Sequence, residues 1–151
     1  MNPAPLVLRG YFVEQLVFSS NPTFDVKSPT MLNVSDIKVE STVNEFDHEG
    51  QKLWQINLHV VQNVPEEKNS PYNFGVTLIG HFQVAEEFPT QRRKRLIETN
   101  GRSLLYGTCR EIIRAATAQG PHQPLLLPTI SFYEPEPDPN ASARVAEDSP
   151  K

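Results

Sequence analysis

Three segments of the chain alternate apolar and polar residues with a period of two. They run from about residue 37 to 44, from 54 to 60 and from 72 to 84, where Gly80 interrupts the alternation. A β-strand places successive side chains on opposite faces, so this period predicts three strands that are each buried on one face. The residues predicted to face inward are Ile37, Val39, Val43, Trp54, Ile56, Leu58, Val60, Tyr72, Phe74, Val76, Leu78, Phe82 and Val84.

A fourth apolar segment, residues 5–19, precedes these three and has a less regular pattern. β-branched and aromatic residues are frequent in it, which favours a strand. Its apolar residues fall on both parities, so we expect both faces of this strand to be covered, and Gly10 is a candidate position for a bulge. Turn signals at residues 47–50 and 65–71 predict an antiparallel meander of four strands or a close variant of one.

After Pro89 the spacing of apolar residues changes to that of a helix. Between residues 97 and 116 they recur every three or four positions. We predict a helix from about Arg102 to Gln119, with a ragged start because Asn100 and Gly101 interrupt the pattern. Gly120 suits the C-terminal cap of this helix.

An apolar, proline-rich segment follows the helix and ends near Tyr133. Residues 134–151 are rich in proline and acidic residues and are expected to form a disordered acidic tail. Four strands followed by helical residues predict one α+β domain, residues 1–133, with helices on one face of the sheet.

Composition narrows the class of protein. The chain has 151 residues, 38% hydrophobic and 21% charged, and a formal net charge of −4. These values predict a soluble domain and argue against nucleic acid as a partner, because nucleic acid favours a basic surface. No apolar run reaches the roughly 18 residues of a membrane span, and no secretory signal is expected. The single cysteine, Cys109, cannot form an intramolecular disulfide, so we expect a cytoplasmic protein.

Few side chains are candidates for chemistry. None of the four histidines has a histidine or cysteine neighbour at a metal-ligand spacing, and His59 and His81 are expected on a polar face of the sheet. Cys109 lies on the apolar side of the predicted helix, where a free cysteine normally acts as a small hydrophobe. The sequence has no phosphate-binding glycine loop and no serine-nucleophile motif. We therefore expect no catalysis, no metal site and no cofactor.

Two features lie outside these patterns. The basic run "RRKR", residues 92–95, is either a solvated loop or first helical turn, or a contact surface for an acidic partner. Large apolar residues also occupy loops or proline-bounded segments, where they either close the core or line an exposed groove that binds other chains. They are Phe24, Met31, Leu32, Leu125, Leu126 and Leu127.

The segment "SLLYGTCREIIRAATAQGPHQPLLLPTISF", residues 103–132, resembles the SecB family of export chaperones and their SecB-like relatives. That family has a helix motif of the type L-x-P-Y-x-R-E-x-I, then a break, then a proline-rich segment ending in L-x-P-x-x-F. Here "LLYGTCREII" and "QGPHQPLLLPTISF" take these places, and "LRGYFVEQLVFSSNP" and "NFGVTLIGHFQV" resemble the first and fourth strands of the family. The resemblance covers about residues 5–133, and the order and spacing of the motifs are more specific than any single motif.

This resemblance implies a four-stranded antiparallel sheet with a long helix and a short second helix on one face. It also implies a homotetramer, a dimer of dimers with helices between the sheets, that holds unfolded chains in hydrophobic grooves without ATP. The residues then expected to contact clients are Phe24, Met31, Leu32, Phe74, Leu78, Phe82, Leu125, Leu127 and Phe132. Those expected at the oligomer interface are Leu105, Ile112 and Ile113.

The chain departs from the family pattern at two sites. Gly107 and Thr108 stand where the helix motif has Pro-Tyr. The acidic residues with which typical SecB proteins dock the translocation ATPase SecA are replaced by Gln15, Ser19, Asn73 and Gly75.

Three hypotheses about function follow. The first is a holdase, either for protein export with SecA or as the dedicated chaperone of a toxin–antitoxin system that protects its antitoxin. The second is a small α+β enzyme with a polar group buried between helix and sheet. The third is a structural oligomerisation module that binds no client.

Overall fold

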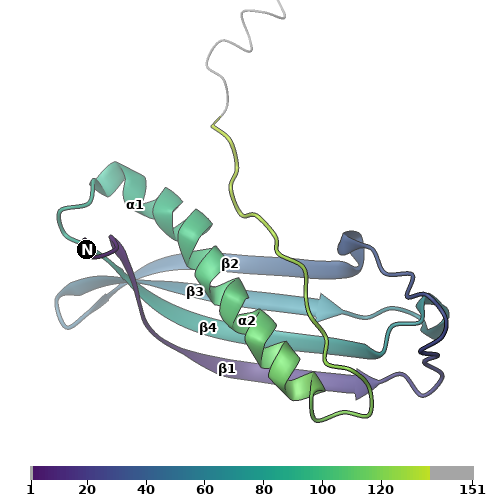
Figure 1. The fold of residues 1–151 in the computed structure, drawn as a ribbon. Helices are drawn as coiled ribbons and strands as arrows, with labels where there is room; N and C mark the ends of the chain where they lie inside the picture. The colour runs from purple at the N-terminus through teal and green to yellow at the C-terminus, as the bar shows by residue number, and fades with distance from the viewer. Residues whose placement is uncertain (1, 137–151) are drawn as a thin grey trace, which may run out of the picture.

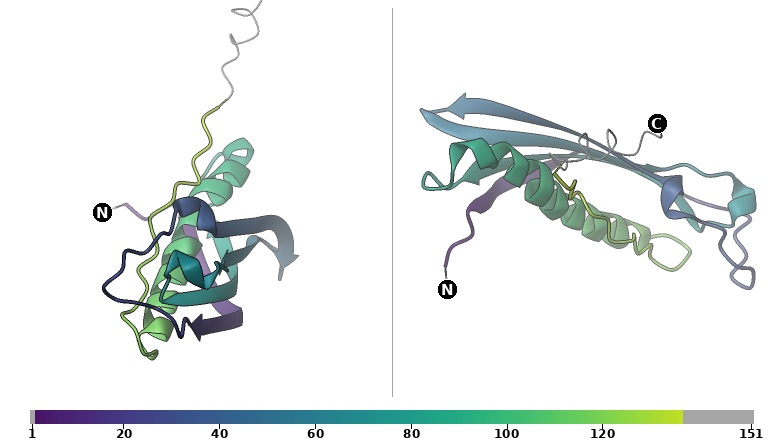
Figure 2. Two further views of the ribbon diagram at one scale, coloured as in Figure 1. Left: turned by 90° about the vertical axis from the view of Figure 1, so that its right-hand side faces the viewer. Right: turned by 90° about the horizontal axis from the view of Figure 1, so that it is seen from above.

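The computed structural model describes residues 2–136. It shows a four-stranded antiparallel sheet with a helical layer on one face (Figure 1; Figure 2). The strands are β1 (Leu6–Ser20), β2 (Ile37–His48), β3 (Gln51–Gln62) and β4 (Tyr72–Val84). Short 3-10 helices, η1 (Val34–Asp36) and η2 (Glu66–Lys68), precede β2 and β4. The predicted α+β class is confirmed. The predicted tail from residue 137 onward lies outside the described residues.

The strand order is β1-β4-β3-β2. Strands β2, β3 and β4 form the predicted meander, and a two-residue turn at Glu49 and Gly50, both with positive φ, joins β2 to β3. Strand β1 pairs with β4 rather than with its neighbour in sequence. Residues 21–33, which we call the crossing loop, therefore connect one edge strand of the sheet with the other.

Two bulges explain the irregular pattern of β1. Its pairing with β4 shifts register between Leu8 and Gly10 and again between Val13 and Gln15. Each extra residue exchanges the two parities. The residues paired with the inward-facing positions of β4 are therefore Leu6, Leu8, Tyr11, Val13, Leu16, Phe18 and Ser20. The bulge expected near Gly10 is confirmed. The bulges thus bring apolar residues of both parities to the inward face, while Val7, Phe12 and Val17 pair with outward-facing positions of β4. Apolar residues on both faces of β1 stay exposed, so the two faces are not covered within the chain as expected.

Three helical elements follow one another without a break and cross the sheet diagonally. They are α1 (Thr90–Leu96), the π-helical segment η3 (Ile97–Gly101) and α2 (Arg102–Thr117). The helix thus begins earlier than predicted, and Asn100 and Gly101 change its hydrogen-bonding pattern without ending it. A Cβ on Gly101 would lie 2.8 Å from Cδ1 of Ile56, so the glycine allows the helix to approach β3 closely.

The prediction that Gly120 caps the helix is wrong, because α2 ends at Thr117 and its C-cap residue is Ala118. Cap glycines usually adopt the left-handed conformation, and Gly120 does not. A Cβ at this position would instead collide with the ring of Tyr72. The short second helix implied by the resemblance is not present in residues 118–136, which are non-helical.

The core lies between the helix and the inner face of the sheet. The inward positions of β3 and β4 are buried, as the alternation predicts, and the cluster is completed by residues of the helix that have 0% exposure: Ile97, Leu105, Cys109 and Ile113. The 0% exposure of Cys109 confirms that it is a core residue, and this burial raises the pKa of its thiol to about 12. No helix within residues 2–136 is long and apolar enough to cross a membrane.

Candidate functional site

A hollow of about 610 Å³ opens where the crossing loop meets the segment after α2. We call it the groove. Its size is that of an ordinary ligand pocket. It is lined by Phe24, Asp25, Val26, Thr30, Pro71, Pro121, His122, Gln123 and Pro124.

Tyr72 and His122 join the two sides of the groove. The buried Tyr72 hydroxyl accepts a hydrogen bond from the backbone N–H of His122 at 2.8 Å and donates one to its carbonyl at 3.0 Å. The His122 ring lies 4.8 Å from the ring of Phe24, and its Nε2 lies 3.1 Å from the carbonyl oxygen of Asn21. These contacts fix the segment after α2 against the crossing loop.

Asn69 holds the crossing loop in shape. Its side-chain amide donates to the carbonyls of Asp25 at 2.9 Å and Ser28 at 3.0 Å, and its Oδ1 accepts from the N–H of Asp25 at 2.9 Å. Main-chain groups are therefore satisfied although the loop has no regular structure. The groove wall is consequently a defined surface.

Two aspartates, Asp25 and Asp36, accept hydrogen bonds in and next to the crossing loop. The Ser28 hydroxyl and then the Lys27 amide lower the pKa of Asp25. The Asn33 amide and then Lys68, whose Nζ lies 2.6 Å from Oδ1, lower the pKa of Asp36. Both carboxylates are thus stabilised in their ionised form.

The sequence predicted nine residues in contact with clients. In the structure, four of them are buried and five are accessible or half-buried. Phe74, Leu78, Phe82 and Leu127 are at most 3% exposed and belong to the core. They have no surface to offer a client while the helix covers the sheet. The expectation that these four contact clients therefore conflicts with their burial. The accessible or half-buried members are Phe24, Met31, Leu32, Leu125 and Phe132.

The residues expected at an oligomer interface are also mostly internal. Leu105 and Ile113 have 0% exposure because they face the sheet, and Ile112 is half-buried. Within one chain, the first two stabilise the core.

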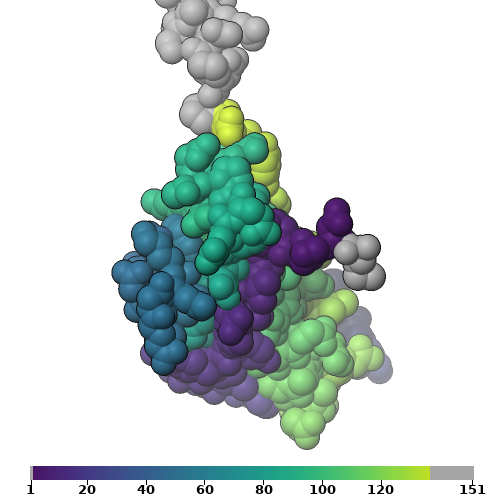
Figure 3. Space-filling view, turned by 90° about the vertical axis from the view of Figure 1, so that its left-hand side faces the viewer, coloured from purple at the N-terminus to yellow at the C-terminus, as the bar shows by residue number. Residues whose placement is uncertain are grey.

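Sequence reasoning missed a second apolar surface, which lies on β1. Six large apolar residues of this edge strand are between 41% and 54% exposed: Val7, Tyr11, Phe12, Val13, Leu16 and Val17. Figure 3 shows this N-terminal strand, in purple, at the surface of the molecule. The mixed parity of the strand signalled apolar residues on both faces, but only the strand order shows that β1 is an edge strand that the helix leaves open.

Two arginines of the basic run, Arg93 and Arg95, are bound within the chain. Arg93 caps the preceding turn by donating to the carbonyls of Phe88 at 3.0 Å and Glu86 at 2.6 Å. Arg95 pairs with Glu136 at 2.8 Å. The acidic partner of Arg95 is therefore part of the same chain.

The outer face of the sheet, opposite the helix, carries Lys38 and Glu40 on β2 but uncharged residues at the positions where acidic ones are replaced. Gln15 pairs with Thr77 and Ser19 with Asn73, so the predicted replacements for acidic residues share this face. His59 lies there as expected, with Nδ1 2.9 Å from the Thr77 hydroxyl. His81 is on the same face, 3.2 Å from Oε1 of Gln55.

The fold places the protein in the class of α+β domains in which one long helix covers part of an open antiparallel sheet. Within this class, the family model described as preprotein translocase subunit SecB matches residues 5–134. The chain therefore belongs to the SecB family.

Two solved structures are similar to this chain. One is the Mycobacterium tuberculosis Rv1957 SecB-like chaperone, solved in complex with a ChAD peptide from the Rv1956 HigA1 antitoxin. It is 13% identical in sequence, the match covers 84% of this chain and 88% of that chain, and the TM-score is 0.49. The other is a protein of unknown function from Streptococcus agalactiae, with 11% identity, 82% and 96% coverage and a TM-score of 0.51. None of the curated proteins compared with the chain matches it.

Proposed function

We propose that this SecB-family protein is a cytoplasmic, ATP-independent holdase that binds unfolded or non-native polypeptides. The groove is the observation that carries the proposal. Two loop segments far apart in sequence, around Phe24 and around His122, meet there and present apolar and aromatic side chains around an open hollow. A chaperone that binds many sequences needs adaptable apolar contact of this kind rather than a fixed set of polar partners.

The client contacts in this proposal are the accessible residues around the groove. Val26 and Met31 are 78% and 65% exposed, and Phe24 and Leu32 are half-buried beside them in the same loop. Leu125 and Phe132 continue the apolar surface along the segment after α2. Phe74, Leu78, Phe82 and Leu127 support this surface from the core.

The proposed assembly is a homotetramer, a dimer of dimers. Its support is the edge strand β1, where Tyr11, Phe12 and Val17 are each about half exposed. Exposed apolar edge strands are prone to pair with other chains, so a partner subunit on this strand would remove the hazard. Several grooves on one assembly would then bind one long client with avidity.

A second candidate function is that of a dedicated chaperone for an antitoxin. The uncharged replacements on the outer face favour it, because Gln15, Ser19 and Asn73 provide no carboxylate there for SecA. Titration of SecA and of any antitoxin encoded next to the gene of this protein separates the two functions. Tight binding of the antitoxin without binding of SecA selects the dedicated function, and the reverse result selects export.

The holdase function is tested by light scattering of a chemically denatured model protein, diluted without ATP. Val26→Asp places a charge on the groove wall, whereas Val34→Asp, at a residue 63% exposed outside the groove lining, is the matched control. We expect suppression of aggregation by the wild type and by Val34→Asp, and a marked loss with Val26→Asp. Equal suppression by all three proteins would remove the groove as the binding site. No suppression of either the model protein or the antitoxin would contradict the holdase function.

A further inference from the structure

Residues 125–136, which we call the strap, run back along one flank of the continuous helix (Figure 1). The contacts begin at the C-terminal end of α2, where the N–H of Leu125 donates to the Thr117 hydroxyl at 2.9 Å. Two turns earlier on the helix, Nε of Arg110 donates to the carbonyl of Leu127 at 2.9 Å. In both contacts a helix side chain binds the main chain of the strap.

The same mode of contact continues toward the N-terminal end of the helix. The Tyr106 hydroxyl donates to the carbonyl of Pro128 at 2.9 Å. Nη2 of Arg95 donates to the carbonyl of Glu134 at 3.0 Å, while Nη1 bonds the Glu136 carboxylate. Carbonyl groups occur in every residue, proline included, so recognition of this kind is largely independent of the strap's side chains.

The dimensions of the two segments match. The helix rises about 33 Å between Arg95 and Thr117 at its usual 1.5 Å per residue. A nearly extended chain spans about 36 Å between Leu125 and Glu136. The flank is therefore as long as an extended polypeptide of the strap's length, and successive turns of the helix can contact successive parts of its main chain.

The strap is not part of the sheet. Within residues 2–136, the strap forms no main-chain hydrogen bond with the main chain of another segment. Its main-chain anchors are the side-chain contacts of the helix, and a segment without ladder hydrogen bonds opens at a lower free energy than a strand does. Leu127, Ile130 and Phe132 pack against the core cluster, whereas Leu126, Thr129 and Ser131 are exposed.

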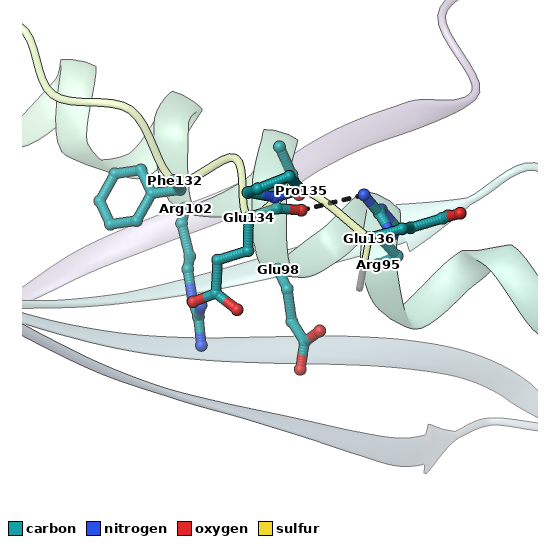
Figure 4. Close-up of a pocket in the computed structure, with 8 residues that line it drawn as sticks. Arg95, Glu98, Arg102, Phe132, Glu134, Pro135 and Glu136 are labelled. Carbon is teal, nitrogen blue, oxygen red and sulfur yellow. Dashed lines mark hydrogen bonds and ion pairs between the residues drawn. The ribbon is translucent and has the colours of Figure 1, made fainter. Parts of the chain in front are cut away.

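Beside the distal part of the strap, one hydrogen-bond donor of the helix has no partner among the described residues. A cavity of about 330 Å³ lies between the helix and the strap, lined by residues that include Arg102, Phe132 and Glu134 (Figure 4). Nε of Arg102 is buried and has no hydrogen-bond partner among the described residues. Arg102 lies one turn from Tyr106, on the same flank. A chain that followed this flank more closely would offer it a carbonyl.

We infer that the flank carrying Arg95, Arg102, Tyr106 and Arg110 is a binding track for the main chain of an extended apolar polypeptide, and that the strap occupies this track as an internal competitor. The occupant is an extended client segment with apolar residues like those of the strap, and the strap itself shows what the track accepts. This inference deepens the proposed holdase function and rests on it for the identity of the occupant as a client. It names the chemistry by which such a client is recognised.

The test uses a fluorescent peptide with the sequence of residues 124–136, titrated against the full-length protein and followed by anisotropy. The covalently attached strap competes at an effective concentration of about millimolar, so the wild type should bind the peptide poorly. Ile130→Ser loosens the strap without changing the track or any residue proposed to contact clients, and Leu126→Ser is the matched control because Leu126 is 72% exposed. We expect peptide affinity at least about tenfold higher for the loosened protein than for the wild type or the control. Glu136→Lys is a second loosening variant that leaves the core intact.

A second set of variants tests the track. In the loosened protein, Arg110→Met should weaken peptide binding about tenfold, because it removes a charge-assisted hydrogen bond. Arg114→Met is the control on the same helix, since Arg114 is exposed and pairs with Glu111. Tyr106→Phe should also weaken binding, while keeping the ring in place.

The outcomes separate the two proposals. Unchanged peptide affinity in both loosened variants, or equal affinity of the Arg110→Met and Arg114→Met proteins, would overturn the track. Peptide binding in the expected order without any suppression of aggregation would leave the track standing and contradict the holdase function. Suppression of aggregation without peptide binding would support the holdase function and overturn the track.

Discussion

The backbone N–H and the carbonyl of His122 are both hydrogen-bonded to the Tyr72 hydroxyl, at 2.8 and 3.0 Å, although the two residues are fifty positions apart in sequence. Tyr72 begins β4, and His122 lies just beyond the end of the helix. One side chain thereby connects the sheet, the segment after α2 and the wall of the groove.

Tyr72→Phe is expected to lower the free energy of unfolding by about 2 kcal/mol, because it leaves two main-chain groups of His122 without partners and removes only one oxygen. Urea denaturation measures this change. Tyr11→Phe is the control, since Tyr11 is 47% exposed, and should change the free energy little. Equal stability of the two variants would show that the Tyr72 contacts do not hold the segment in place.

Two glycine substitutions should have opposite effects. Gly120→Ala is expected to lower the free energy of unfolding by about 1–3 kcal/mol, because the new methyl group meets the ring of Tyr72. Gly107→Ala should raise it by about 0.5–1 kcal/mol, because Gly107 lies inside α2 with no atom near its potential Cβ. Thermal unfolding of both variants beside the wild type checks the signs, and a stabilised Gly120→Ala protein would contradict the close packing described here.

Neighbouring leucines of the strap should differ sharply. Leu127 is 3% exposed and Leu126 is 72% exposed. Leu127→Ala should therefore lower the free energy of unfolding by about 2–4 kcal/mol through loss of burial and formation of a cavity, whereas Leu126→Ala should change it by less than about 0.5 kcal/mol. A Leu127→Ala protein of normal stability with weakened client binding would make Leu127 a groove residue, as first expected, instead of a core residue.

The order of the crossing-loop region should depend on acidic pH. The pKa of Asp36 is lowered below its ordinary 3.8 by the Asn33 amide and then by Lys68. Its contacts are therefore fully stabilising above pH 3.8 and are lost as the pH falls through the lower folded-state value. An NMR titration of the Asn33 amide should show a midpoint below pH 3.8, and Asp36→Asn should abolish the transition. A midpoint at or above 3.8 would contradict the lowered pKa.

Elements with a local signal could be predicted from the amino-acid sequence alone. Alternation identified β2, β3 and β4 and their buried faces, and helical spacing identified α2 and the burial of Cys109, because side-chain direction follows directly from backbone periodicity. The motifs around Arg110 and Pro128 carried the resemblance that the family match confirms.

Exposure, in contrast, depends on how the elements pack against one another. Phe74, Leu78 and Phe82 have the same apolar pattern whether a helix or solvent covers them, and Tyr11 and Val13 are left open only because β1 pairs with β4 at the sheet edge. Alternation within a strand does not specify its neighbour, and the closure entropy of a loop changes slowly with its length, so the crossing loop does not select one partner for β1. The path of the strap is likewise decided by contacts with helix side chains distant in sequence, which no local pattern encodes.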